Sequence, residues 1–144
     1  PRADDGYGTI DRVADFVNSR LAYRFGSSDH TTDAIDTLGS GEGVCRDFAH
    51  LAIALLRAIG VPARYVAAYA PGLDPQDFHA IVEAHDGGRW RAVDPTGLCD
   101  PTFAVPISRG RDSADTAFLS IYSGAVQIGA PVVSAEIITG HQRV

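Results

Sequence analysis

The sequence predicts an α+β domain in which helices come first along the chain and antiparallel strands follow. Three observations carry this prediction. Apolar residues recur at helical spacing up to residue 59, whereas from residue 63 onward they occur in short runs rich in β-branched and aromatic side chains. The sequence D-G-G at residues 86–88 separates two such runs, which is typical of a β-hairpin. Because helices and strands do not alternate, the pattern favours an antiparallel sheet over parallel βαβ units.

Helices are expected in three places in the first part of the chain. The first covers about residues 10–20, with Thr9 as a cap, and the second covers about residues 32–39. The third and longest covers about residues 44–59 and ends at a glycine followed two residues later by a proline. Its apolar face is broad, so we expect it to be the central, well-buried helix.

Strands are expected after this helix. Those flanking and forming the hairpin cover residues 63–69, 78–85 and 89–94. Past Pro95 the chain contains Pro101, Pro106 and Gly110, so we expect irregular structure there. Beyond it, three apolar stretches predict further antiparallel strands, at residues 117–122, 125–129 and 131–138.

Length and composition are those of one globular domain. The chain has 144 residues, 45% hydrophobic and 21% charged, so we expect residues 1–144 to form a single domain. It begins at Pro1 and contains no Met, so it can be a piece of a longer chain. The net charge of −6 argues against nucleic acid and anionic membranes as partners, because both need concentrated positive charge. No apolar run is long enough to span a membrane and no secretory signal opens the chain, so a cytoplasmic location is expected.

One of the two cysteines, Cys45, lies where a glycine-rich loop meets the start of the expected central helix. Unpaired N–H groups and the positive end of the helix dipole favour a thiolate there over a thiol. The N–H groups around Cys45 and Arg46 could also hold an oxyanion, and the Arg46 side chain could add positive charge or lie in solvent. Position alone leaves open the alternative that Cys45 is a small apolar residue at a helix end.

A cysteine nucleophile needs a base, and the base needs a partner that orients it. The hairpin offers His79 and Asp94. If the turn is Asp86-Gly87, these two residues lie directly opposite each other; if it is Gly87-Gly88, they are diagonal neighbours on the same face. Only a three-residue loop without a bulge would separate them onto opposite faces. Both two-residue turns therefore predict an imidazole and a carboxylate within reach of each other.

Other chemically capable residues receive structural roles. His50 lies five positions after Cys45, about 140° further around the helix, so we expect a buried, hydrogen-bonded role for it. Cys99 has no base near it in the sequence and is expected to be a structural thiol. A metal site drawn from Cys45, His50, His79 or His85 lacks zinc-ligand spacing, and no calcium-loop pattern occurs. We therefore expect no metal and no cofactor.

Three stretches share their order with a known family. The stretches GEGVCRDFAHLAIALLRAIGVPARYVAAY, DFHAIVEA and RWRAVDPTG resemble the bacterial transglutaminase-like domain, in a superfamily that also contains papain-type cysteine peptidases. The resemblance covers roughly residues 31–97. It implies that Cys45 is the nucleophile, His79 the general base and acid, and Asp94 the residue that orients His79. It also implies a papain/transglutaminase-like core, with the nucleophile-bearing helix packed on an antiparallel sheet.

These residues predict a catalytic domain that needs no cofactor. A Cys45 thiolate would attack a carboxamide or peptide carbonyl of a peptide or protein substrate, such as a Gln side chain, and form a thioester. An amine acceptor would make the protein a transglutaminase, and water would make it a peptidase, deamidase or amidase. The alternatives are an inactive interaction domain of the same fold and an arylamine N-acetyltransferase-like enzyme, for which the chain is short. The sequence predicts no oligomeric state.

Overall fold

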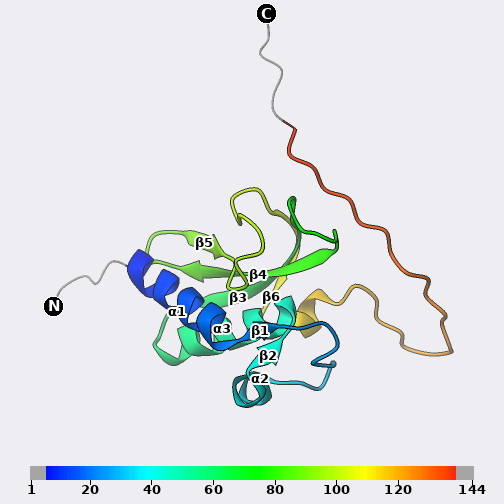
Figure 1. The fold of residues 1–144 in the computed structure, drawn as a ribbon, viewed down its shortest axis with the longest axis horizontal. Coiled ribbons are helices and arrows are strands. Elements are labelled where there is room, and N and C mark those ends of the chain that lie inside the picture. Colours follow the sequence, from blue (N-terminus) through cyan, green and yellow to red (C-terminus); the bar gives the residue numbers. More distant parts are fainter. Residues whose placement is uncertain (1–5, 139–144) are drawn as a thin grey trace, which may run out of the picture.

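The computed structural model describes residues 6–138 and confirms the α+β class. Four antiparallel strands form one sheet in the order β5-β4-β3-β6, with the helices gathered on one of its faces (Figure 1). A second, two-stranded parallel sheet joins β1 to β2. The elements in chain order are α1 (Gly6–Arg20), β1 (Ala22–Tyr23), α2 (Ala34–Ser40), β2 (Glu42–Gly43), α3 (Cys45–Ala58), β3 (Ala63–Tyr69), β4 (Phe78–His85), β5 (Trp90–Val93), β6 (Val105–Gly110) and the 3₁₀ helix η1 (Ser113–Thr116).

Helix α3 is the central helix that the apolar pattern predicts. Phe48, Leu51, Ala52 and Leu56 are at most 3% exposed, and they pack in one cluster with residues of α1, β3 and β4. This spacing of three and four residues places all of them on one helix face. Helix α1 begins at Gly6, so Thr9 lies inside it and the expected cap is wrong. Among the described residues, no helix has the length and apolar character needed to cross a membrane.

The central strands β3 and β4 are buried on both faces. Tyr65 and Val82 belong to the cluster that packs on α3, whereas Val66, Ala68 and Ile81 form a second cluster on the opposite face. Successive strand residues point to opposite faces, which explains this division. The second cluster is closed by residues from β5 and from the chain between β5 and β6, namely Ala92, Cys99 and Ala104. That segment therefore brings Cys99 against the sheet face remote from α3.

The β4–β5 hairpin has one of the two predicted registers. Val82 pairs with Val93 and His85 with Trp90, so the turn is Gly87-Gly88. The N–H of Asp86 donates to the carbonyl of Arg89 and closes the turn, and Gly87 has a φ of +91°, which a side chain would strain. Strand β5 ends at Val93, so Asp94 follows directly at the strand end.

The chain after β5 differs from the prediction in two ways. Residues 105–110, expected to be irregular, form strand β6 beside β3. Pro106 is tolerated because β6 is an edge strand, and a bulge opposite Ala67 and Ala68 leaves Ile107 without a pairing partner on β3. Residues 117–138, expected to form strands, are extended and carry none (Figure 1).

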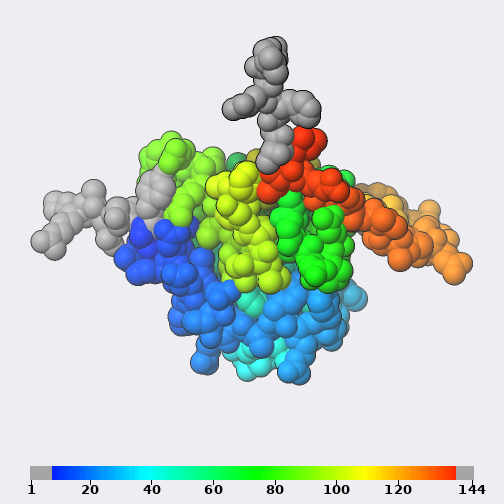
Figure 2. Space-filling model, turned by 45° about the horizontal axis from the view of Figure 1, so that its top comes forward, coloured from blue at the N-terminus to red at the C-terminus, as the bar shows by residue number. Residues whose placement is uncertain are grey.

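This C-terminal segment, residues 117–138, contacts the rest of the described chain near both of its ends. The Phe118 ring contacts Phe78 with centroids 5.4 Å apart. Farther along, the Gln76 side chain donates to the carbonyl of Ala135 at 3.0 Å and accepts its N–H at 2.7 Å. In Figure 2 the red part of the segment lies against the green loop that contains Gln76. Side-chain contacts therefore hold the segment, rather than strand pairing.

Candidate active site

Cys45 is the first residue of helix α3 and is half-buried. The loop before it is held by the β1–β2 pairing, in which the N–H groups of Ala22 and Arg24 donate to the carbonyls of Gly41 and Gly43 at 2.8 and 2.9 Å. Gly43 packs against the helix that follows, because an added Cβ would lie 2.7 Å from the Cβ of Asp47. The glycine at 43 is thus required for packing of the loop on α3, in addition to any access that it gives to Cys45.

Asp47, in the first turn of α3, is a buried carboxylate. Its side chain accepts the N–H of Val44 at 2.8 Å and the hydroxyl of Ser28, and it pairs with the Arg46 guanidinium at 3.2 Å. These partners compensate a charge that is 1% exposed. An acidic residue three positions after a helix N-cap was the available sequence signal.

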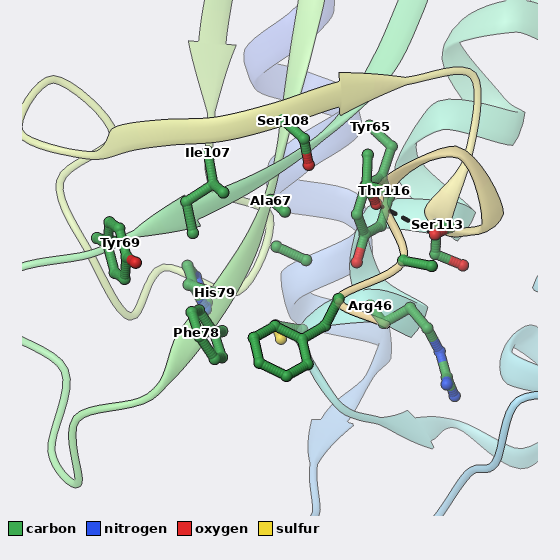
Figure 3. A pocket seen from close by; sticks show the side chains of 14 residues that line it. Arg46, Tyr65, Ala67, Tyr69, Phe78, His79, Ile107, Ser108, Ser113 and Thr116 are labelled. Atoms are coloured by element: carbon green, nitrogen blue, oxygen red, sulfur yellow. Dashed lines mark hydrogen bonds between the residues drawn. The ribbon is translucent and has the colours of Figure 1, made fainter. Parts of the chain in front are cut away.

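The Arg46 side chain is used in the same network. Its guanidinium donates to the Ser28 hydroxyl at 3.1 Å and to the carbonyl of Asp29. In Figure 3 the side chain extends away from Phe78 and His79. The guanidinium therefore fixes the chain near residue 28 to α3, and an oxyanion role for Arg46 rests on its backbone N–H and stays a prediction.

His79 and Asp94 meet as the hairpin register predicted. The ring Nε2 of His79 lies 2.9 Å from Oδ2 of Asp94, and both side chains are 1% exposed. The other carboxylate oxygen, Oδ1, accepts the N–H and the hydroxyl of Thr96 at 2.9 and 2.7 Å. The N–H of Cys99 donates to Oδ2 at 3.0 Å. Four hydrogen bonds therefore fix the carboxylate in the orientation that meets the ring.

Helix α1 holds the turn that follows Asp94. Asn18 donates from Nδ2 to the carbonyls of Pro95 and Thr96 at 3.2 and 2.8 Å. Sequence reasoning missed both Asn18 and Thr96. The Thr96 contact had a signal, because an aspartate often accepts the N–H two residues later in a turn. The Asn18 contact spans 77 residues and had none.

The pKa shifts of the pair share one cause. Burial alone would lower the pKa of His79, but its hydrogen bonds to Asp94, Cys45 and Cys99 outweigh burial and raise that pKa. Burial would raise the pKa of Asp94, but the contact with His79 and the Thr96 donors lower it. A protonated imidazole beside an ionised carboxylate is therefore the favoured state of the pair, and Cys45 is among the groups that stabilise the protonated ring.

Tyr23 is a further neighbour of Cys45 that sequence reasoning missed. Burial and the nearby Cys45 thiol raise the pKa of Tyr23 to about 12, so its hydroxyl keeps its proton at neutral pH. The ring is fixed between Phe25 and Phe48, at centroid distances of 5.4 and 5.8 Å. The site thus holds a neutral O–H donor near the thiol.

Cys99 lies next to the buried His79–Asp94 pair. The expectation that no base lies near this thiol is wrong: ligand atoms of His79, Asp94 and Cys99 all lie within 4.8 Å of one another. Burial raises the pKa of the Cys99 thiol and contact with His79 lowers it, with a net rise. The loop after Asp94 folds back onto the sheet and brings this second thiol to the same imidazole.

Two cavities flank Cys45 and His79. The larger, about 550 Å³, is lined mainly by apolar and aromatic side chains, among them Phe118 and, as Figure 3 shows, Tyr65, Phe78 and Ile107. The bulge in β6 directs Ile107 into it (Figure 3). The smaller, about 370 Å³, lies toward Tyr23 and the loop before β4, and it shares Cys45, Phe78 and His79 with the first. A ligand that filled both would pass across Cys45.

His50 has the hydrogen-bonded role expected for it, but it is half-buried rather than buried. Its Nε2 accepts the N–H of Ser113 at 3.3 Å, and its ring packs on Tyr65 with centroids 5.5 Å apart. Burial lowers the pKa of His50, so the ring is neutral at pH 7. It holds the segment after β6 against α3.

Comparison with known proteins places this arrangement in a family. The family model described as the transglutaminase-like superfamily matches residues 2–95. The uncharacterized protein ML0607 of Mycobacterium leprae is 36% identical over 125 residues, which are 78% of this chain and 43% of that protein. A solved structure of a candidate cysteine protease from Cytophaga hutchinsonii matches with 45% identity and a TM-score of 0.79, over 82% of this chain and 41% of that one.

A more distant structure, LapG of Legionella pneumophila, shares the fold alone, with 21% identity and a TM-score of 0.55 over 73% of this chain and 65% of that one. The chain spans less than half the length of the Mycobacterium and Cytophaga proteins. The family model nevertheless spans α1 to β5, so the matched part includes Cys45, His79 and Asp94. Strand β6 lies outside the match. Because the family model matches well more than half of this chain's residues, the chain belongs to the transglutaminase-like superfamily.

Proposed function

We propose that this protein is a cysteine-dependent hydrolase or acyltransferase acting at carboxamide or peptide bonds, with Cys45 as nucleophile, His79 as general base and acid, and Asp94 as the residue that orients His79. The observation that carries the proposal is the buried His79–Asp94 pair, 2.9 Å apart, whose histidine lines the same two cavities as Cys45. A thiol, an imidazole and a carboxylate in this order are the groups that thiol acyl transfer requires.

The reaction begins with the thiolate of Cys45 paired with the imidazolium of His79. The sulfur attacks the carbonyl carbon, a C–S bond forms and the carbonyl oxygen becomes an oxyanion. We assign its stabilisation to the N–H groups of Cys45 and Arg46, which lack intrahelical acceptors in the first turn of α3, and to the hydroxyl of Tyr23. Collapse breaks the C–N bond, and His79 gives its proton to the leaving nitrogen.

The thioester on Cys45 is then resolved by a second nucleophile. His79 takes a proton from water or from an amine as it attacks the thioester carbonyl, and collapse releases the Cys45 thiolate and leaves His79 protonated again. Asp94, held by Thr96, keeps the ring oriented through both halves. Each cycle returns the ion pair with which it began.

Hydrolysis of a peptide bond is the outcome that we propose to test first. The Cytophaga protein, 45% identical over most of this chain, is described as a candidate cysteine protease. The two cavities on either side of Cys45 suit a peptide that crosses the site in an extended form. We therefore propose a peptide or protein substrate, with transfer to an amine as the second outcome. The single catalytic domain over residues 1–144, the cytoplasmic location and the exclusion of nucleic acid and membranes stay predictions from the sequence.

The decisive experiment is the pH dependence of Cys45 alkylation by iodoacetamide, read at the Cys45 peptide by mass spectrometry so that Cys99 does not contribute. The pKa of His79 is raised, so the imidazolium persists at neutral pH and labelling should be fast below pH 7. His79→Ala should slow it roughly 10- to 100-fold at pH 6, because an ordinary thiol is hardly ionised there. His85→Ala, at the hairpin tip, is the matched control. Equal Cys45 labelling rates in the wild type and in His79→Ala would contradict the proposal.

A turnover assay distinguishes an active enzyme from an inactive interaction domain. A panel of peptide amides, with and without an amine acceptor, should give products that Cys45→Ala abolishes. Tyr23→Phe should lower kcat roughly 10- to 100-fold with little change in KM, because the hydroxyl would act only on the oxyanion. A reactive Cys45 that never forms a thioester with any substrate would favour the interaction domain, and a thioester with acetyl-CoA would favour the N-acetyltransferase alternative.

A further inference from the structure

The second thiol, Cys99, has no part in the proposed reaction, yet it lies at the ring on which that reaction depends. His79 comes from β4, Asp94 follows β5, and Cys99 lies five residues farther along the loop. One ligand atom from each lies within 4.8 Å of the other two. The site therefore gathers imidazole, carboxylate and thiol donors, which is the donor set that Zn²⁺ accepts.

The distances between the three ligand atoms fit Zn²⁺ after small movements of the side chains. Two ligands at tetrahedral angles around Zn²⁺ are separated by roughly 3.3–3.8 Å, given bonds of about 2.0–2.1 Å to nitrogen and oxygen and about 2.3 Å to sulfur. His79 Nε2 and Asp94 Oδ2, now 2.9 Å apart, would separate by a few tenths of an ångström, and Cys99 would approach within its loop. The charges also balance, since one carboxylate and one thiolate neutralise the divalent cation.

The surroundings would support a bound ion. The second oxygen of Asp94 is already held by the N–H and hydroxyl of Thr96, as the outer partners of a metal-bound carboxylate usually are. Cys99 packs on the apolar cluster of Val66, Ala68 and Ile81, and a site surrounded by such groups strengthens the attraction between ion and ligands. Three protein ligands leave a fourth position of the tetrahedron for water.

We propose that His79, Asp94 and Cys99 form a binding site for one Zn²⁺ ion, and that the bound ion inhibits the protein by occupying His79. Binding releases the thiol proton of Cys99 and the Nε2 proton of His79 to solvent, so it weakens as the pH falls. The imidazole can then no longer receive a proton at the ligated nitrogen or pair with Asp94. The metal sets weighed from the sequence did not include Cys99, because the loop that brings it to His79 spans no recognisable motif. Inhibition rests on the proposed function, whereas metal binding does not.

Binding is tested on the full chain with Zn²⁺ in competition with a chromophoric chelator, and with Co²⁺, whose thiolate ligation gives a charge-transfer absorption band. The wild type and Cys45→Ser should each bind one Zn²⁺ with a dissociation constant of about 1 µM or tighter at pH 7.5. Cys99→Ser should weaken binding by about 100-fold or more, since even the loss of an outer partner costs 10- to 100-fold. The Co²⁺ band should be present in Cys45→Ser and absent in Cys99→Ser.

Circular dichroism and thermal unfolding establish that each variant is folded, and Cys99→Ala provides a second removal of the thiol if Cys99→Ser unfolds. Undiminished Zn²⁺ binding by a folded Cys99 variant, together with loss of binding in Cys45→Ser, would assign the ion to Cys45 and overturn the proposal. Failure of the wild type to bind Zn²⁺ at all would also overturn it. The Co²⁺ spectrum is read without substrate, so a protein that turns over no peptide can still confirm or refute the metal site.

Discussion

Helix α3 and the C-terminal segment are both rich in apolar residues, yet the helix is largely buried and the segment is largely exposed. Phe48 in α3 is 2% exposed, whereas Phe118 in the segment is 72% exposed and Tyr122 is 96% exposed. The helix forms the centre of the core, and the segment extends outside the folded body without a strand (Figures 1 and 2). Apolar composition therefore predicts neither burial nor regular structure by itself.

The physical difference lies in where the backbone hydrogen bonds can go. A helix satisfies its own N–H and C=O groups, so an amphipathic sequence such as α3 needs only a surface to cover. A strand instead needs a neighbouring strand whose N–H and C=O groups are still unpaired. The two edges of the sheet are β5, only four residues long, and β6, which carries Pro106 and a bulge. Such edges resist pairing with a further strand, and the segment at residues 117–138 stays unpaired.

The largest difference in unfolding free energy between the two regions is expected from a matched pair of phenylalanine substitutions. Phe48→Ala should lower the free energy of unfolding by about 3–5 kcal/mol, because it opens a cavity in the core. Phe118→Ala should change it by less than about 0.5 kcal/mol, because the ring is mostly in solvent. Urea unfolding measures both. Similar losses for the two variants would show that the segment contributes to the core as much as α3 does.

A second pair compares two glycines. Gly43→Ala should cost about 1–3 kcal/mol of unfolding free energy, because the new Cβ meets the Cβ of buried Asp47 at 2.7 Å. Gly129→Ala, in the C-terminal segment, has nothing within 4 Å and should change stability by less than about 0.5 kcal/mol. Thermal unfolding of both variants checks the difference. A neutral Gly43→Ala would mean that the loop before Cys45 moves aside readily.

A third pair compares two amide side chains that each make two hydrogen bonds to a distant backbone. Asn18→Ala removes the bonds from α1 to Pro95 and Thr96 and should cost about 1 kcal/mol of unfolding free energy. It should also slow Cys45 alkylation, because the turn that holds Asp94 is released. Gln76→Ala removes the bonds to Ala135 and should leave both quantities within error of the wild type. An equal alkylation rate in Asn18→Ala would show that Thr96 needs no support from α1.

The smallest effect is expected from removing the segment. Deletion of residues 119–144 should change the unfolding free energy by less than about 0.5 kcal/mol, because exposed groups contribute little. Chemical denaturation of the shortened chain measures this. A loss above about 1 kcal/mol would show that the Gln76–Ala135 contact, or the rest of the segment, is part of the cooperative folding unit.

Particular residues show how far the sequence reached. The turn chemistry of residues 86–88 favoured two-residue turns, and both of the possible ones bring His79 to Asp94, whereas a three-residue loop would have separated the pair. Strand β6 was not, because Pro106 reads as a strand breaker unless the strand is known to be at an edge. Asp47 follows a helix N-cap by three residues, which is a recognisable local pattern, but its burial against Ser28, 19 residues away, had no sequence signal.

The sequence by itself determined the helices, the hairpin and the position of Cys45 at a helix N-terminus, because these depend on neighbours within a few residues along the chain. Tertiary structure alone decided that Cys99 lies beside His79, that Asn18 supports the turn holding Asp94, and that residues 117–138 find no strand to pair with. Those outcomes depend on which surfaces and backbone groups remain available once the core has packed, and no local pattern of residues encodes that availability.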